Sequence, residues 1–317
     1  MKFIRGIKNI PDISSGTVLT IGNFDGIHLG HQSIINRVRQ KASEQGLPSG
    51  VVFFEPQPKE FFCRGSKPPR LTSLHQKYYQ FSKLDLDYLF CLRFSEQIAS
   101  LSPQEFIEQI LIDRLNVKHL IIGDDFQFGS GRSGNYAVLL EYSEKTGLFT
   151  VEKTPSFILN GVRVSSTAIR NALAADRLDL ASSYLGRLYG IWGKVMHGKQ
   201  LGRTLGFPTA NINFNQYVAP VSGVYAVYVT VGGTRYRGMA NIGSNPTVNG
   251  DTSRLEVFIF DFSGDIYGEW IFVELLQKIR SEVKFAGLDE LREQLAKDRK
   301  TAEKLLAPQL SPTSDNI

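Results

Sequence analysis

The chain has 317 residues, a length that favours two domains of ordinary size. Its 42% of hydrophobic and 21% of charged residues are typical of a folded globular protein. No apolar run approaches the roughly 20 residues of a membrane helix, and the N-terminus lacks the apolar stretch of a signal peptide. The two cysteines, Cys63 and Cys91, are too few for a disulfide framework. These features predict a cytoplasmic protein and disfavour membrane and secreted classes.

The formal net charge is +5, from 36 Lys and Arg against 31 Asp and Glu. The sequence has no run of five basic residues, whereas nucleic-acid-binding proteins usually carry Lys/Arg clusters. Scattered cations suit phosphorylated small molecules better. We therefore expect an anionic small-molecule ligand, and no nucleic-acid, membrane or obligate protein partner.

Short apolar runs alternate with amphipathic stretches over residues 1–186. The amphipathic stretches at residues 34–42 and 103–115 place apolar residues three and four positions apart, as helices do. The apolar runs have strand length and are typical of strands that are buried on both faces. These runs are residues 17–22, 51–54, 88–92 and 119–122. The alternation predicts an α/β domain with a parallel sheet and crossover helices.

The pattern changes near residue 189, so we place the domain boundary at residue 186. The hairpin dipeptides Gly232–Gly233 and Asn249–Gly250 punctuate the second part, residues 187–307. Strand-like runs surround them, at residues 189–196, 224–231, 234–243 and 254–262. This pattern predicts an antiparallel sheet or small barrel. A terminal helix follows at residues 288–306, and we expect residues 308–317 to be a disordered tail.

The sequence GNFDGIHLGH, residues 22–31, joins the first apolar strand to the helix that begins near Gln32. A glycine-rich turn before a helix offers free N–H groups and the helix dipole to an anion. His28 and His31 are three positions apart, so they share one face of the helix start. There they can stabilise negative charge that develops on a phosphate. The alternative is an ordinary tight turn with two surface histidines.

A second glycine-rich segment, residues 129–134, fits the G-x-G-x-x-G pattern of dinucleotide-binding proteins. That pattern needs its glycines directly after a strand, but Asp124, Asp125 and Phe126 intervene here. We therefore expect a loop over a ligand and not an NAD site. Asp124 and Asp125 can contact a ligand or serve as turn residues.

Three hydroxyl residues, Ser165, Ser166 and Thr167, stand just before a helical stretch, and Arg170 lies one turn inside it. Hydroxyls at this place can bind a phosphate or cap the helix, and an Arg can add bidentate phosphate contacts. The residues alone leave both roles open.

Glycines recur through GKVMHGKQLGRTLGFPTAN, residues 193–211, which suits close approach of the backbone to phosphates. The segment is not a P-loop, because Arg203 follows Gly202 where a P-loop has Lys. Thr209 and Asn211 are two positions apart on an extended segment, so their neutral oxygens face one side. Such oxygens suit Mg²⁺ beside phosphate. The alternative is a Gly/Pro-rich hairpin with two structural hydrogen bonds.

Glu256 is a carboxylate inside the otherwise apolar strand LEVFIF. Burying a charged group in such a strand is costly unless the charge is paired. A carboxylate at such a position is therefore a candidate for a functional role, and proton abstraction suits a carboxylate. The alternative is a surface Glu at the edge of a sheet.

These motifs resemble those of bifunctional bacterial riboflavin kinases/FAD synthetases over about residues 15–305. The similar segments are residues 22–31, 54–58, 123–134, 164–170, 193–211, 223–227, 239–247, 255–268 and 278–291. The resemblance implies a Rossmann-like nucleotidyltransferase domain, then an antiparallel β-barrel of the riboflavin kinase type with a terminal helix. The chain departs from the family at Gln57, where the family often has His, and at Asn245, where it commonly has Arg.

The resemblance also implies a role for each site residue. Glu256 is the expected base of riboflavin phosphorylation, and His28 and His31 act in adenylyl transfer. The residues expected to bind ATP or its phosphates are Gly22, Phe24, Asp25, Gly26, Ser165, Ser166, Thr167, Arg170, Gly198, Lys199, Gly202 and Arg203. Those expected to bind the flavin are Asp124, Asp125, Phe126, Arg280, Glu282 and Phe285. Thr209 and Asn211 are the expected Mg²⁺ ligands.

The predicted function is the phosphorylation of riboflavin to FMN by ATP, followed by adenylylation of FMN to FAD with release of pyrophosphate. A class I aminoacyl-tRNA synthetase-like enzyme shares His-x-Gly-His, but it would need a KMSKS-type segment where this chain has SSTAIR. A non-catalytic flavin- or nucleic-acid-binding module is the second alternative. The presence of Glu256, Thr209, Asn211, His28 and His31 speaks against a decayed site.

Overall fold

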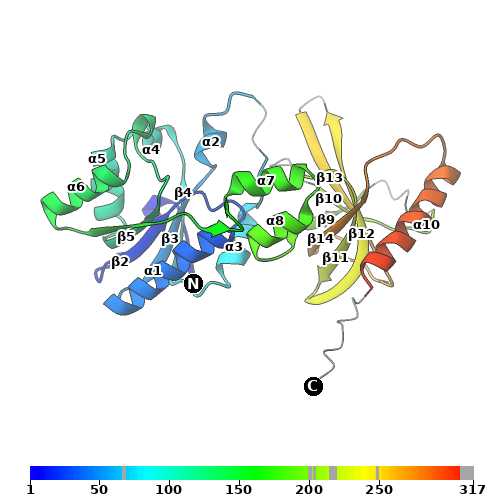
Figure 1. Cartoon of the computed structure of the whole chain (residues 1–317), viewed down its shortest axis with the longest axis horizontal. Coiled ribbons are helices and arrows are strands. Elements are labelled where there is room, and N and C mark those ends of the chain that lie inside the picture. Colours follow the sequence, from blue (N-terminus) through cyan, green and yellow to red (C-terminus); the bar gives the residue numbers. More distant parts are fainter. Residues whose placement is uncertain (66–68, 199–201, 203–204, 214–219, 248–249, 308–317) are drawn as a thin grey trace, which may run out of the picture. The chain divides into compact units, whose positions relative to one another are not determined.

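The computed structural model describes residues 1–65, 69–198, 202, 205–213, 220–247 and 250–307 (Figure 1). The chain divides into two compact units. The first comprises Met1–Pro68 and Leu74–Ala168, and the second comprises Pro69–Ser73 and Ile169–Ile317. The predicted tail at residues 308–317 lies outside the described residues.

The first unit contains a six-stranded parallel sheet with the order β1-β4-β3-β2-β5-β6. Its strands are β1 (Lys2–Arg5), β2 (Thr17–Ile21), β3 (Ser49–Glu55), β4 (Tyr88–Arg93), β5 (Val117–Gly123) and β6 (Thr150–Thr154). The four predicted strands correspond to β2 to β5, which confirms the parallel α/β architecture. A small hairpin, β7 (Ile158–Leu159) with β8 (Val162–Arg163), completes the strands of this unit.

The helices of the first unit bury both faces of its sheet. They are α1 (Leu29–Gln45), α2 (Pro58–Phe61), α3 (Leu74–Phe81), α4 (Glu96–Ser100), α5 (Pro103–Phe106), the π-helical segment Ile107–Ile112 and α6 (Tyr136–Thr146). Successive β2 residues enter different cores: Val18 packs with Val38 of α1, whereas Leu19 lies in the core that contains Phe106 and Leu139. Coverage of both faces explains why the strands are uninterrupted apolar runs.

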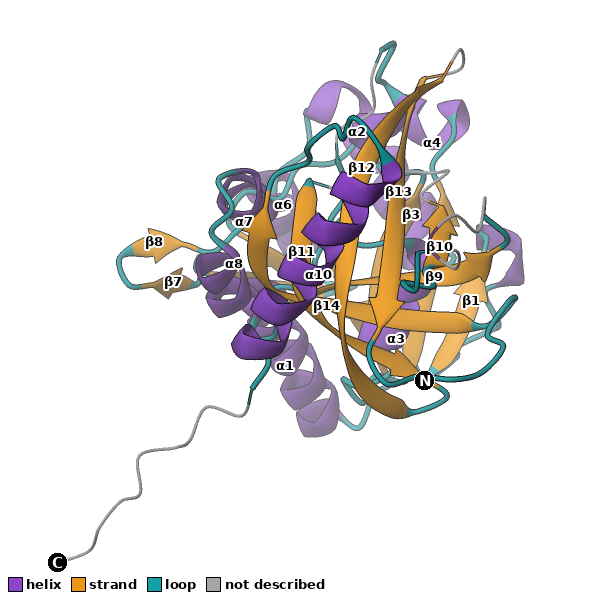
Figure 2. Cartoon of the chain, turned by 90° about the vertical axis from the view of Figure 1, so that its right-hand side faces the viewer, coloured by secondary structure: helices purple, strands orange, loops and turns teal. Residues whose placement is uncertain are grey.

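The second unit contains a closed antiparallel barrel with the strand order β10-β13-β12-β11-β14-β9 (Figure 2). Its strands are β9 (Tyr189–Met196), β10 (Ala210–Asn213), β11 (Gly223–Val231), β12 (Thr234–Thr247), β13 (Gly250–Ile259) and β14 (Trp270–Arg280). The Gly232–Gly233 turn is confirmed: both residues have positive φ, as a tight hairpin requires, and Val231 pairs with Thr234. In the second predicted turn, Asn249 lies outside the described residues.

Alternation along the barrel strands separates an inner from an outer face. Leu255 and Val257 are fully buried and alternate with Glu256 and Phe258. Helix α10 (Leu288–Leu305), the predicted terminal helix, covers part of the outer face, where Phe258 shares a core with α10 residues. The site of the second unit lies on this outer face.

The residues just before the barrel group with it. Helix α8 (Leu178–Leu185) packs against β9 and β14, and Lys278 Nζ lies 2.8 Å from a carboxylate oxygen of Asp176. Helix α7 (Ser166–Ala174) spans the division between the units at residues 168 and 169. The functional boundary at residue 186 stays a prediction.

Neither cysteine forms a disulfide: Cys63 is half-buried, and Cys91 is buried. Burial raises the pKa of the Cys91 thiol to about 11, so this thiol is protonated at neutral pH. Within the described ranges, no helix has the length and apolar character needed to cross a bilayer.

Candidate active sites

The turn between β2 and α1 has an unusual backbone. Phe24 and Ile27 have φ values of 47° and 43°, a left-handed conformation that side chains other than Gly rarely adopt. Both side chains are nearly fully buried in one apolar core, with 2% and 1% exposure, and this packing stabilises the strained turn. Gly26, with φ of 87°, supplies the remaining left-handed position. Strain of this kind at a predicted phosphate-binding turn is consistent with a functional role.

His28 and His31 lie together at the start of α1. His28 is the N-cap residue, and its Nδ1 accepts a hydrogen bond of 3.3 Å from the backbone N–H of His31. Because Nδ1 accepts, neutral His28 carries its proton on Nε2, where it can donate to an anion. The two rings stack with centroids 3.6 Å apart. Gly30 permits this arrangement, since a Cβ there would lie 3.2 Å from His28 Nδ1. The structure therefore brings the two predicted catalytic histidines into contact.

Side chains from elsewhere in the first unit hold the same turn. The buried Lys77 donates a hydrogen bond of 2.8 Å to the carbonyl of Asn23, and Ser166 donates one of 2.8 Å to the carbonyl of Asp25. Both bonds fix backbone groups of the predicted phosphate-binding turn. Lys77 has no motif around it, so the sequence interpretation did not include it.

The hydroxyl segment before α7 has mixed roles. Ser165 caps α7 by accepting a hydrogen bond from the N–H of Ala168, Ser166 reaches the turn, and Thr167 is exposed. Arg170 belongs to the second unit, where its Nε donates to the carbonyl of Pro69 at 2.7 Å. The capping role is thus present at Ser165, and phosphate binding stays a prediction for the set.

The segment after β5 carries the predicted flavin contacts Asp124, Asp125 and Phe126. Arg163 of β8 makes ion pairs with Asp124 at 3.0 Å and with Asp125 at 2.9 Å. Phe126 stacks on Phe128 and packs against the sheet core. The two carboxylates are therefore tied to the β7–β8 hairpin, a partner that their spacing did not reveal.

Sheet topology places two of these motifs at one edge of the sheet. β3 and β4 follow β2 on one side, whereas β5 pairs with the other side of β2. Open α/β sheets bind ligands at the carboxyl ends of strands where the order reverses in this way. The Gly22–His31 turn follows β2, and the segment Asp124–Phe126 follows β5. The first unit thus has the arrangement of a nucleotide site.

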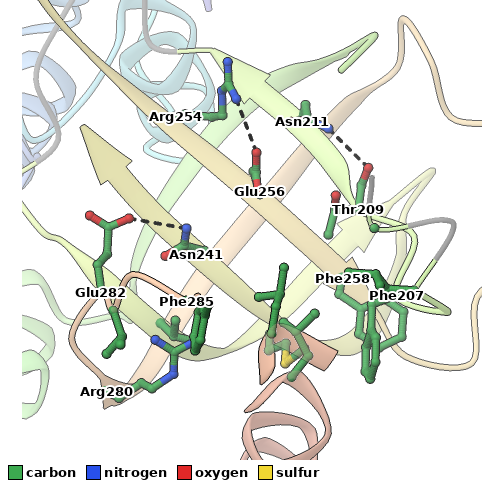
Figure 3. Close-up of a pocket in the computed structure, with 17 residues that line it drawn as sticks. Phe207, Thr209, Asn211, Asn241, Arg254, Glu256, Phe258, Arg280, Glu282 and Phe285 are labelled. Atoms are coloured by element: carbon green, nitrogen blue, oxygen red, sulfur yellow. Dashed lines mark hydrogen bonds and ion pairs between the residues drawn. The ribbon is translucent and has the colours of Figure 1, made fainter. Parts of the chain in front are cut away.

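The second unit contains a cavity of about 270 Å³ between the outer face of the barrel and α10 (Figure 3). One wall is polar and the rest is mostly apolar. The cavity is lined by Gly202, Leu205, Phe207, Thr209, Asn211, Val224, Met239, Asn241, Arg254, Glu256, Phe258, Arg280, Glu282, Val283, Phe285, Leu291 and Leu295. It therefore brings together Gly202, Thr209, Asn211, Glu256, Arg280, Glu282 and Phe285 of the predicted site residues.

Glu256 lies in the polar wall between two asparagines. It pairs in register with Asn211 of β10 and with Asn241 of β12, so the three side chains form one row across the barrel (Figure 3). The Glu256 side chain is 35% exposed, and its carboxylate lies 3.5 Å from the guanidinium of Arg254. Since β13 is an interior strand of a closed barrel, Glu256 is not on a sheet edge. Asn241 was missed, although it too is polar within an apolar stretch, MANIG.

The glycine-rich segment approaches the predicted metal ligands. A Cβ on Gly198 would collide with the Asn211 amide, and one on Gly202 would collide with the carbonyl of Phe207. Asn211 Nδ2 lies 3.4 Å from the carbonyl of Thr209, which it donates to. Lys199 and Arg203, two predicted phosphate contacts, lie outside the described residues.

At the other end of the cavity, the guanidinium of Arg280 is held by α10. It donates to the buried carboxylate of Asp298 at 2.8 to 3.0 Å and lies over the Phe285 ring at 5.6 Å. Glu282 accepts a long hydrogen bond of 3.5 Å from Asn241 Nδ2. Arg280 therefore connects β14 to α10, and this connection shapes the cavity beside Glu282 and Phe285.

Gln57 and Asn245 are the two positions at which the sequence differs from the family pattern. Gln57 is buried at the start of α2, where its backbone N–H donates a hydrogen bond of 3.1 Å to the carboxylate of Glu60. Asn245 belongs to β12, and its side chain lies outside the described part of the chain.

A strained, glycine-rich turn at the switch point of a parallel sheet, together with a carboxylate-bearing pocket on a separate barrel, is the arrangement expected of a nucleotide-dependent transferase with two sites. Family models agree with both halves: FAD synthetase matches residues 10–168, and riboflavin kinase matches residues 185–306. The chain belongs to the bifunctional riboflavin kinase/FMN adenylyltransferase family. It uses ATP to convert riboflavin to FMN and FMN to FAD. This membership decides against the aminoacyl-tRNA synthetase-like and non-catalytic alternatives.

Full-length relatives support this membership. The bifunctional riboflavin kinase/FMN adenylyltransferase of Haemophilus influenzae is 49% identical over 96% of this chain and 98% of its own length. The Escherichia coli K12 protein of the same name is 47% identical over 95% of this chain and 97% of its own. A crystal structure described as a macrolide-efflux protein from Streptococcus pneumoniae is 32% identical, with a TM-score of 0.81 over 96% of this chain and 99% of that one.

Proposed function

We propose that the cavity beside α10 is the riboflavin kinase site and that Glu256 is its general base. The observation that carries this proposal is the row Asn211–Glu256–Asn241, which opens into a largely apolar cavity. Glu256 takes the proton of the riboflavin 5′-hydroxyl as that oxygen bonds to the γ-phosphorus of ATP. The bond between this phosphorus and the bridging oxygen breaks, so FMN forms and ADP leaves.

We propose that adenylyl transfer takes place at the Gly22–His31 turn. A phosphate oxygen of FMN attacks the α-phosphorus of a second ATP, and the bond to the bridging oxygen breaks to release pyrophosphate. His28, with its proton on Nε2, and the stacked His31 stabilise the charge that grows on the phosphates. The N–H groups at the start of α1 act in the same direction.

Thr209 and Asn211 fit a magnesium ion that arrives with ATP. Both offer neutral oxygens at the cavity, a donor set that suits Mg²⁺ when phosphates supply the anionic ligands. Among the residues described, no cluster of three or more His, Cys, Asp or Glu could hold a metal by itself. When bound, Mg²⁺ would neutralise charge on the transferring phosphates. Cytoplasmic location, and action without nucleic-acid, membrane or protein partners, are parts of the proposal.

Replacing Thr209 by Val should raise the Mg²⁺ requirement of the kinase step by roughly tenfold, because one oxygen is lost while the β-branched shape remains. The measurement is the rate of FMN formation against Mg²⁺ concentration. Thr230→Val, on β11 away from the cavity, is the matched control and should behave as wild type. Unaltered Mg²⁺ dependence in Thr209→Val would leave only a structural role for Thr209.

Separate fragments should separate the two activities, because each motif set lies within one predicted domain. Residues 187–317 should phosphorylate riboflavin without making FAD, and residues 1–186 should do the reverse. The longer fragment 169–317 keeps α8 against β9 and β14, so we expect it to be the more stable kinase. Chromatography of flavins after incubation with Mg-ATP measures both steps. A folded 169–317 fragment without kinase activity would contradict this separation.

A further inference from the structure

Asn241 lies beside the proposed base Glu256, and it is not among the site residues predicted from the sequence. It pairs in register with Glu256 on one side and with Val224 on the other, and it lines the same cavity (Figure 3). Directly opposed side chains on neighbouring strands have Cβ atoms about 4.5–5.5 Å apart. If one ligand contacts both side chains, the ligand group at Asn241 is therefore only a few covalent bonds away from the ligand group at Glu256.

The orientation of the Asn241 amide follows from its neighbour. Glu282 Oε1 lies 3.5 Å from Asn241 Nδ2, and a carboxylate accepts hydrogen bonds but does not donate them. The amide nitrogen therefore faces Glu282, which leaves Oδ1 on the other side of the group. This oxygen is buried, and no donor reaches it among the residues that the structure describes. A buried acceptor without a donor is costly, so a ligand that donates there gains more than one that leaves it unpaired.

The polarity of the cavity lining indicates which hydrogen-bond donor would suit Asn241 Oδ1. Apolar residues such as Val224, Met239 and Phe258 surround the polar row, so the cavity has one hydrogen-bonding wall and a large apolar remainder. Riboflavin has a similar division, because it joins a flat aromatic ring system with an apolar dimethylbenzene end to a ribityl chain of hydroxyls. If the terminal hydroxyl meets Glu256, an internal hydroxyl of the chain comes within reach of Asn241.

We propose that Asn241 Oδ1 accepts a hydrogen bond from an internal ribityl hydroxyl and so makes the kinase site specific for flavins with a polyol chain. The proposal rests on the proposed function, since it places the ribityl chain along the Glu256 row. Asn241 acts here as a specificity-determining residue. The carboxylate of Glu282 fixes its amide by accepting from Nδ2.

The test compares riboflavin with a flavin analogue whose side chain is an unbranched hydroxypentyl group. This analogue keeps the reacting terminal hydroxyl and lacks the internal ones. Wild type should prefer riboflavin by about 10–100-fold in kcat/KM, because the analogue leaves the buried oxygen unpaired. Asn241→Ala should lower kcat/KM for riboflavin by about tenfold and change that for the analogue by less than about threefold. The preference for riboflavin therefore shrinks.

Val224→Ala is the matched control, because Val224 faces Asn241 across the β11–β12 pair and offers no hydrogen bond. It should change kcat/KM for the two substrates by the same factor. Equal losses for both substrates in Asn241→Ala would overturn the proposal. So would a wild-type enzyme that accepts both flavins equally, a measurement that needs no variant to fold. Either result can occur while Glu256→Gln strongly lowers the rate of phosphorylation, so failure here is distinct from failure of the base assignment.

Discussion

Replacing Glu256 by Gln should lower the rate of riboflavin phosphorylation by about 10²–10⁴-fold, the usual contribution of a positioned general base. Gln keeps the shape of the side chain and its place between Asn211 and Asn241, but it cannot take the hydroxyl proton. The measurement is the rate of FMN formation from riboflavin and Mg-ATP. FMN supplied directly should still become FAD at the wild-type rate, because the Gly22–His31 turn, where adenylyl transfer is proposed, lies in the first unit.

Glu274→Gln is a suitable control for removal of a barrel carboxylate. Glu274 lies on β14, where it pairs with Arg235 at 2.9 Å and does not line the cavity. Its loss should change phosphorylation by less than about threefold, the scale of a largely surface ion pair. Wild-type phosphorylation in Glu256→Gln would show that another group takes the proton.

Replacing His31 by Ala should lower FAD formation by about 10²–10³-fold, the usual cost of losing one group that stabilises transition-state charge. Riboflavin phosphorylation should continue, so FMN accumulates in the intact enzyme. His31 is the better choice than His28, because the His28 ring also caps α1 and its loss would disturb the helix start. Flavin chromatography over time follows both products in one reaction.

The kinase step of the same variant controls for gross misfolding of the barrel, and the secondary structure of the variant controls for the first unit. The assignment of His31 fails if Ala supports FAD formation at the wild-type rate. It also fails if the folded variant loses riboflavin phosphorylation, since the two chemistries would then share a residue.

Much of the fold could be predicted because strands that are buried on both faces appear in the sequence as uninterrupted apolar runs. The run at residues 51–54 is the centre of β3, the run at residues 88–92 is nearly all of β4, and both strands lie inside the sheet. The edge strand β1 was missed: it has a single buried residue, Ile4, among exposed neighbours. A strand with so little burial carries too little apolar pattern to distinguish it from a loop.

The candidate sites could be predicted as motifs but not as contacts. Glu256 stood out in LEVFIF, yet its pairing with Asn211 and Asn241 depends on the register of a closed barrel, and alternation along one strand does not fix register. The pairing of Asp124 with Arg163 joins residues 39 positions apart. Which distant residues become partners depends on the tertiary path of the chain, and the spacing of residues within a motif does not determine that path.

The closed barrel described above also limits how this chain can associate with copies of itself. Where the barrel strands pair on both sides, they offer no row of unpaired backbone groups to which a second molecule could add a strand. The open sheet does have two borders, β1 and β6, and these carry Lys2, Arg5, Glu152 and Lys153. Charged side chains at such borders oppose strand addition. The closed part of the barrel and the charged borders of the open sheet therefore disfavour the edge-to-edge stacking through which β-rich proteins aggregate.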